Sequence, residues 1–132
     1  MRLHKLTFAA LTALALGCAA PAYAQEADMN AFSAACTGAQ TFLIGEELPP
    51  GVDGVKLMEA LCGCVVADFK VLPQVDVDLL TTDLLQTSTD ATHAAHADYQ
   101  ALQERAGEGL AACFGSAEVV ALLPADPAAP AQ

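Results

Sequence analysis

The sequence predicts an all-α protein, a small four- to five-helix bundle joined by two disulfides, and three observations support this class. Apolar residues recur at helical spacings of three and four along several segments, and no alternating strand pattern competes with them. Four of the five cysteines, Cys36, Cys62, Cys64 and Cys113, fall inside three of these segments. Short stretches rich in Gly, Pro, Asp, Ser and Thr, which favour turns, separate the segments.

Residues 1–24 have the features of a cleaved signal peptide. A positively charged start at residues 2–5 precedes an apolar run at residues 6–20, and Ala-Tyr-Ala at residues 22–24 supplies the small side chains that signal peptidase recognises. The apolar run is too short for a membrane span. We therefore expect cleavage after Ala24 and a periplasmic or secreted protein. The alternative is a lipoprotein acylated at Cys18, which lies in a Leu-Gly-Cys-Ala sequence.

The chain is strongly acidic, with a formal net charge of −11. Arg2 and Lys5 leave with the signal peptide while all 16 acidic residues remain, so three basic side chains are left and the formal charge becomes −13. Such a surface repels phosphate groups, which disfavours binding of nucleic acid and of anionic membranes. We expect a soluble monomer that binds no cofactor and whose partner is an unknown protein or small ligand.

The first two helices are expected at residues 29–44 and 54–70. The first has one apolar stripe at spacings of four, three and four, formed by Phe32, Cys36, Ala39 and Leu43. Gly45 ends this helix, and the connector at residues 46–52 contains Pro-Pro-Gly, which no helix accommodates. Asp53 is expected to cap the second helix, whose apolar face centres on Val65.

A third and a fourth helix follow the break at Leu72-Pro73. The third is expected to start at Asp76 or Asp78, to end before residues 86–90, and to bury Val77, Leu80, Leu84 and also Leu79 and Leu85. The fourth is expected to start at Thr89 or Asp90 and to reach Phe114, with its stripe at Ala95, Tyr99, Leu102, Ala106, Leu110 and Cys113.

The fourth helix also contains Gly107 and Gly109, which weaken a helix and are expected to bend it. A further short helix can form within residues 116–123. Residues 25–123 then make a single helical domain, and the Pro- and Ala-rich residues 124–132 are expected to form a disordered tail.

The second helix places Cys62 and Cys64 on opposite sides of its apolar stripe, so each thiol points to a different neighbour. A Cys62–Cys64 bond would close a strained ring. Because the first two helices form an antiparallel hairpin, Cys36 and Cys62 lie nearly level, each about eight residues from the connector at about 1.5 Å per residue. This favours the pairs Cys36–Cys62 and Cys64–Cys113 over the crossed pairs. Gly63 is expected where this helix crosses another.

Two groups of residues are candidates for chemistry. The close pair Cys62 and Cys64 could serve metal binding or thiol exchange, but it lies within a helix that has few cations nearby to stabilise a thiolate, so we expect structural disulfides. His93 and His96 are spaced to share a metal ion, with Asp90 or Asp98 as an oxygen ligand. On one continuous helix, however, both histidines lie outside the apolar stripe, and we expect a solvated polar face.

No catalytic constellation is apparent. The sequence has no nucleophile with a recognisable base, no glycine-rich phosphate loop and no carboxylates that can be paired across a cleft. We therefore expect a non-enzymatic binding, accessory or structural module of the periplasm. The alternative is a metal-handling or thiol-redox periplasmic protein that uses the Cys-Gly-Cys pair, the histidine face, or both.

Overall fold

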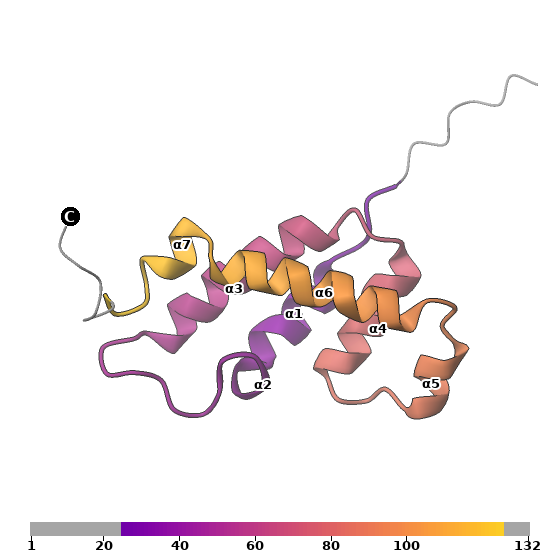
Figure 1. Cartoon of the computed structure of the whole chain (residues 1–132), viewed down its shortest axis with the longest axis horizontal. Helices are drawn as coiled ribbons and strands as arrows, with labels where there is room; N and C mark the ends of the chain where they lie inside the picture. Colours follow the sequence, from indigo (N-terminus) through magenta and orange to yellow (C-terminus); the bar gives the residue numbers. More distant parts are fainter. Residues whose placement is uncertain (1–24, 126–132) are drawn as a thin grey trace, which may run out of the picture.

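The computed structural model describes residues 25–125, so the expected signal peptide, Cys18 and residues 126–132 of the expected tail lie outside the described part. Within this part the chain forms helices and no strand, which confirms the all-α class (Figure 1). None of the described helices is long and apolar enough to cross a membrane. The helices are α1 (Asn30–Gly38), α2 (Gln40–Ile44), α3 (Gly54–Phe69), α4 (Gln74–Leu84), α5 (Asp90–Ala95), α6 (Tyr99–Phe114) and α7 (Ala117–Val120).

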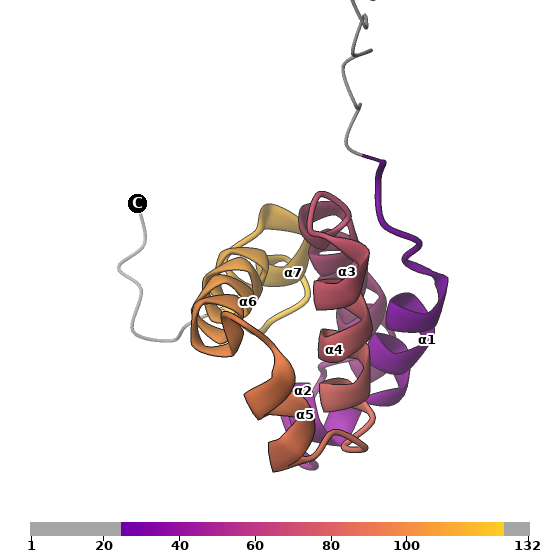
Figure 2. The same cartoon turned by 90° about the vertical axis from the view of Figure 1, so that its right-hand side faces the viewer.

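The long helix α3 lies at the centre of the fold. Helices α1, α6 and α7 pack on it, and α4 packs on α1. Both α1 and α6 run antiparallel to α3, and α3 lies between them (Figures 1 and 2). The Ala27 N–H donates to the Lys70 carbonyl (3.0 Å), so the chain enters α1 beside the end of α3. Leu61, in the middle of α3, is completely buried.

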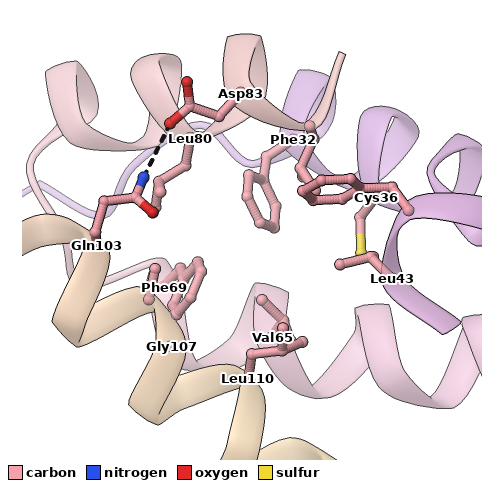
Figure 3. Close-up of a pocket in the computed structure, with 13 residues that line it drawn as sticks. Phe32, Cys36, Leu43, Val65, Phe69, Leu80, Asp83, Gln103, Gly107 and Leu110 are labelled. Carbon is pink, nitrogen blue, oxygen red and sulfur yellow. Dashed lines mark hydrogen bonds between the residues drawn. The ribbon is translucent and has the colours of Figure 1, made fainter. Parts of the chain in front are cut away.

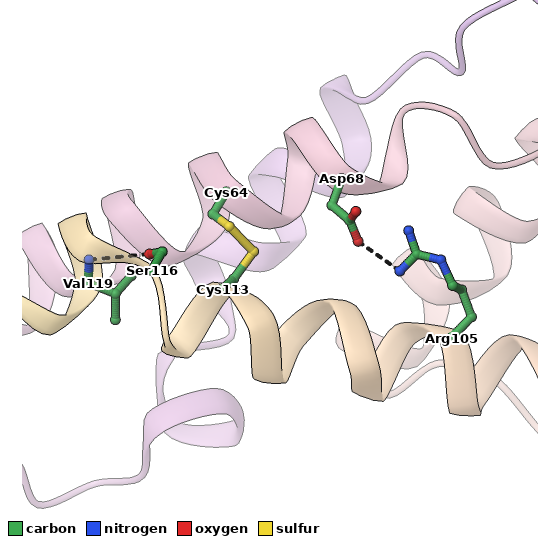
Figure 4. Close-up of a disulfide and its surroundings, with 6 residues drawn as sticks. All are labelled: Cys64, Asp68, Arg105, Cys113, Ser116 and Val119. Atoms are coloured by element: carbon green, nitrogen blue, oxygen red, sulfur yellow. Dashed lines mark hydrogen bonds and ion pairs between the residues drawn. A yellow bond between two sulfur atoms is a disulfide. The ribbon is translucent and has the colours of Figure 1, made fainter.

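The expected disulfide pairing is confirmed. Cys36 is bonded to Cys62 with a Cα–Cα distance of 5.9 Å, and Cys64 to Cys113 with a Cα–Cα distance of 5.7 Å. The first bond joins α1 to α3. The second joins α6 to α3 (Figure 4). Because the two cysteines of α3 diverge around its apolar stripe, one helix is bonded to a neighbour on each side.

Helix α3 has the predicted start, whereas α4 begins earlier than predicted. The Asp53 carboxylate accepts from the backbone N–H groups of Val55 and Lys56, so Asp53 caps α3 as expected. Helix α4 begins directly after Pro73, whose carbonyl accepts from the Val77 N–H (3.2 Å). Proline lacks an N–H and is therefore compatible with a helix start. Leu79 is buried, but Leu85 lies beyond α4 and is 55% exposed.

The single helix expected at residues 29–44 is interrupted. The backbone leaves α-helical geometry at Ala39, where the N–H donates to the Cys36 carbonyl in a tighter turn. The Thr37 hydroxyl donates to the carbonyls of Ser33 and Ala34 one turn earlier, and Gly38 adds a weak helix former. These neighbours explain why α1 and α2 are separate helices.

The single helix expected at residues 90–114 is also interrupted, between α5 and α6. Thr89 caps α5 as expected, but His96 adopts an extended backbone and its side chain reaches Asp76 on α4. Ala95 is exposed and does not belong to the buried stripe. The tertiary contact with α4 therefore overrides the helical pattern of the sequence at this point.

The glycines of α6 do not interrupt it, since the helix continues from Tyr99 to Phe114. Gly109 instead lies against α3, where a Cβ atom would come within 2.6 Å of the Phe69 ring. The expected crossing at Gly63 is wrong, because a Cβ atom there would have no neighbour within 4 Å. The glycine that permits close helix packing is thus on α6 and not on α3.

Candidate functional site

An apolar cavity of about 260 Å³ lies among α1, α2, α3, α4 and α6. Side chains from these helices point toward one space (Figure 3). Most of the lining is aliphatic or aromatic, including Phe32, Val65, Phe69, Leu80, Leu84 and Leu110. The polar lining residues in the described chain are Asp83 on α4 and Gln103 on α6. An apolar cavity with a few convergent polar groups is the usual form of a small-molecule site.

The cavity exists because α4 and α6, which line it from opposite sides, do not pack closely on each other. Helix α6 packs on α3 and α7, whereas α4 packs on α1. On the cavity side α6 presents two very small residues, Ala106 and Gly107, and a Cβ atom at Gly107 would have no neighbour within 4 Å. Small side chains leave the space between α4 and α6 unfilled.

Helix α2 borders the cavity loosely. It has five residues, none of which is buried. Phe42 lines the cavity and is nevertheless 60% exposed, a high value for a large aromatic side chain. An occupant of the cavity would cover part of this ring, so binding would remove additional apolar surface from water.

Asp83 and Gln103 join α4 to α6 at the polar side of the cavity (Figure 3). The Gln103 Nε2 donates to Asp83 Oδ2 (3.1 Å) and to the Tyr99 hydroxyl (2.9 Å), which itself donates to Asp83 Oδ2 (3.2 Å). His93 Nε2 bonds to Asp83 Oδ1 (2.8 Å), and its ring stacks on Tyr99 with 4.0 Å between the centroids. One carboxylate therefore connects α4, α5 and α6.

Asp83 is held in its ionised form. Burial raises the pKa of this carboxyl, but hydrogen bonds from Ser88, His93 and Tyr99 stabilise the anion and lower the pKa below its usual value. Burial and the Asp83 charge conversely raise the pKa of the Tyr99 phenol, which keeps its proton as a donor. The polar side of the cavity thus carries a negative charge at neutral pH.

The two histidines are partly buried and do not lie on a fully solvated face, in contrast to the expectation. The His93 side chain is 27% exposed, and His96, bonded to Asp76 Oδ1 (2.7 Å), is 14% exposed, with its Nδ1 atom buried and without a hydrogen-bond partner. The expectation was wrong because it assumed one continuous helix. The break after α5 turns both rings toward α4.

The structure does not assemble the metal-binding set His93, His96, Asp90 and Asp98. The Nε2 atoms of the two histidines bond to different carboxylates, Asp83 and Asp76. Within residues 25–125, no three or more His, Cys, Asp or Glu side chains form a group that could hold a metal ion.

Sequence analysis missed Asp83 and Gln103 as site residues. A signal was present, because Asp83 follows Leu80 by three residues and Leu79 by four and so shares the buried face of its helix. A carboxylate on an apolar face is uncommon unless it is paired. Gln103 follows Tyr99 by four residues and gives a weaker signal.

Comparisons with protein-family models, with curated proteins and with solved structures found no match. The fold and the site define the class directly: a small, disulfide-bonded, all-helical protein with an apolar cavity. Two disulfides in a chain of this size are typical of an oxidising, extracytoplasmic environment.

Proposed function

We propose that the protein is an exported, non-enzymatic binding protein that holds a small, largely apolar molecule in the cavity between α4 and α6. The observation that carries the proposal is the cavity itself, about 260 Å³ of space lined mainly by apolar side chains. A dry engineered cavity of about 150 Å³ in another protein is large enough to bind benzene. The space here suits a ligand somewhat larger than one aromatic ring.

The disulfides support a binding role because they join three of the helices that line the cavity, α1, α3 and α6. Cys36 lines the cavity and is bonded to α3, and Cys113 fixes α6 to the same helix. Walls that are ordered before binding lose less conformational entropy when a ligand enters. A cavity in a core poor in large side chains would otherwise tend to close.

Export is the second part of the proposal. The features of residues 1–24 fit a signal peptide cleaved after Ala24, and the disulfides fit a periplasmic or secreted location. Acylation at Cys18 is the alternative form of export. Mass spectrometry of the exported protein distinguishes a chain that begins at Gln25 from one that begins with a lipid-modified Cys18.

The test of binding uses 4-phenylbutan-1-ol, a neutral probe with one aromatic ring and a short chain. At about 0.3 kcal/mol per non-hydrogen atom, a probe of about eleven atoms binds with a Kd in the low-millimolar range, which an NMR titration can measure. We expect saturable shifts in the amide signals of residues that line the cavity, such as Leu80 and Leu110. No saturable shift at these residues would overturn the proposal.

A blocking variant identifies the cavity as the site. Gly107→Leu places an apolar side chain at the unfilled wall of the cavity and removes a weak helix former, so the variant should remain folded. Gly63→Leu makes the same chemical change at an exposed glycine of α3 with no neighbour within 4 Å. We expect binding to be lost in the first variant and retained in the second. Equal binding in both would place the probe elsewhere.

A further inference from the structure

We infer that the ligand of this cavity is an apolar molecule that ends in a protonated amine, with the ammonium group held between Asp83 and Gln103. The inference rests on the proposed binding function and specifies the chemical class of the ligand. It is carried by the acceptor and the charge at the polar side of the cavity.

At the polar side of the cavity the Gln103 carbonyl oxygen is the acceptor left for a ligand, because the Asp83 oxygens already accept from Ser88, His93, Tyr99 and Gln103. An ionised carboxylate accepts only, so the Gln103 amide must direct its NH₂ group at Asp83, as the 3.1 Å contact shows. The Gln103 NH₂ group is thereby engaged by Asp83 and by Tyr99. The Gln103 carbonyl oxygen then faces away from the carboxylate, and Figure 3 shows both groups on one side of the cavity. An ammonium group, which only donates, can bond to this oxygen and lie beside the Asp83 charge.

No lysine or arginine among the described residues forms an ion pair with Asp83. Among the described residues that line the cavity, none is a lysine, arginine or histidine. Of the side chains that hydrogen-bond to Asp83 in the described chain, His93 alone can become positive, and then only when it is protonated. The Asp83 side chain is 19% exposed, so its charge is weakly screened by solvent. A cationic group is favoured here and a carboxylate is disfavoured.

Three probes with the same apolar body separate this inference from the proposed function. They are 4-phenylbutylamine, 4-phenylbutan-1-ol and 5-phenylpentanoate, each with four methylene groups between the ring and the polar group, titrated at neutral pH and at about 150 mM salt. A charge-assisted hydrogen bond is roughly twice as strong as a neutral one, so we expect the amine to bind about five- to tenfold more tightly than the alcohol. The carboxylate should bind more weakly than the alcohol. We also expect intermolecular NOEs between the methylene group next to nitrogen and the Gln103 side chain.

A matched pair of variants separates the local carboxylate from the general acidity of the chain. Asp83→Asn removes the charge at the cavity, while Asp98→Asn removes one charge at an exposed residue before α6. We expect Asp83→Asn to abolish the preference for the amine while it retains binding of the alcohol, which reports an intact cavity. Asp98→Asn should keep the preference.

Each outcome has one meaning. If no probe binds, the proposed function fails. If the alcohol binds but the amine has no advantage, or if the carboxylate binds best, the cavity is a binding site and the inference about the amine is wrong. An amine preference that both variants keep equally would show attraction by the acidic surface and would also overturn the inference. If Asp83→Asn fails to fold, the wild-type order of the three probes and the NOEs to Gln103 still decide the question.

Discussion

Replacing Gly109 with alanine tests the packing that positions α6 on α3. The added Cβ atom would lie 2.5 Å from Asp68 Oδ2, 2.6 Å from Phe69 Cε1 and 2.9 Å from an Arg105 guanidinium nitrogen. Each distance is too short, so neighbouring atoms must move. The ends of Asp68 and Arg105 can adjust, although they form an ion pair of 2.8 Å that the adjustment would strain (Figure 4). The Phe69 ring is 3% exposed and has less freedom.

The expected change in the free energy of unfolding follows from two opposing effects. Overpacking a well-packed site costs typically about 1–3 kcal/mol. Alanine in place of glycine within a helix gains about 0.5–1 kcal/mol, because the unfolded chain loses conformational freedom. The Gly109→Ala protein should therefore be less stable than the wild type by about 0–2.5 kcal/mol. The low end of this range applies if the Phe69 ring moves into the cavity that it lines.

Gly63→Ala is the matched control, because it makes the same substitution within α3 at a site with no neighbour within 4 Å. Alanine at this position stabilises the helix as it does at Gly109, but it overpacks nothing. The two variants should therefore differ by about 1–3 kcal/mol in the free energy of unfolding. Urea unfolding followed by circular dichroism, with the disulfides intact, measures this difference. Equal stabilities for the two variants would refute the argument that α6 needs a glycine at its contact with α3.

Two further predictions concern acid and reduction. The hydrogen bond from Arg105 lowers the pKa of Asp68 below its usual value, so the unfolded state takes up this proton first as the pH falls. The stabilisation is complete above the unfolded pKa of about 3.9 and is lost below it. Asp68→Asn should therefore reduce the fall in the urea midpoint between about pH 5 and pH 3, and Asp98→Asn should not; equal falls would contradict this. Reduction should cost about 3.5 kcal/mol for the bond spanning 26 residues and about 4 kcal/mol for the bond spanning 49, on the chain-entropy account. Alkylation and mass spectrometry should find the described cysteines protected until reduction, with loss of helicity afterwards; a reduced protein that melts like the oxidised one would contradict the role given to the disulfides.

The helical class, the cap of α3 and the disulfide pairing could be predicted because each depends on local rules. Helical periodicity is a property of neighbouring residues, and Asp53 caps α3 through N–H groups two and three residues away. The disulfide pairing also depends on a short connector, which makes the first two helices antiparallel. Local spacing then placed Cys36 level with Cys62.

The break between α5 and α6 and the site could not be predicted, because they depend on contacts between distant segments. His96 leaves the helix where its ring reaches Asp76, twenty residues earlier in the chain. Asp83 receives hydrogen bonds from Tyr99 and Gln103, 16 and 20 residues later. A helical wheel drawn for one continuous helix cannot show these partners, and it assigned the histidines to solvent for that reason.

The small side chains of this protein explain both its disulfides and its cavity. Helices that present residues such as Ala106 and Gly107 to their neighbours bury little apolar area, and the stabilisation from burial is correspondingly small. The same small residues leave space between α4 and α6 that larger side chains would fill. The Cys36–Cys62 and Cys64–Cys113 bonds offset the weak core and join α1 and α6, two of the helices that line that space, to α3. A larger apolar residue at Gly107 would fill that space and remove the cavity in which we propose that the ligand binds.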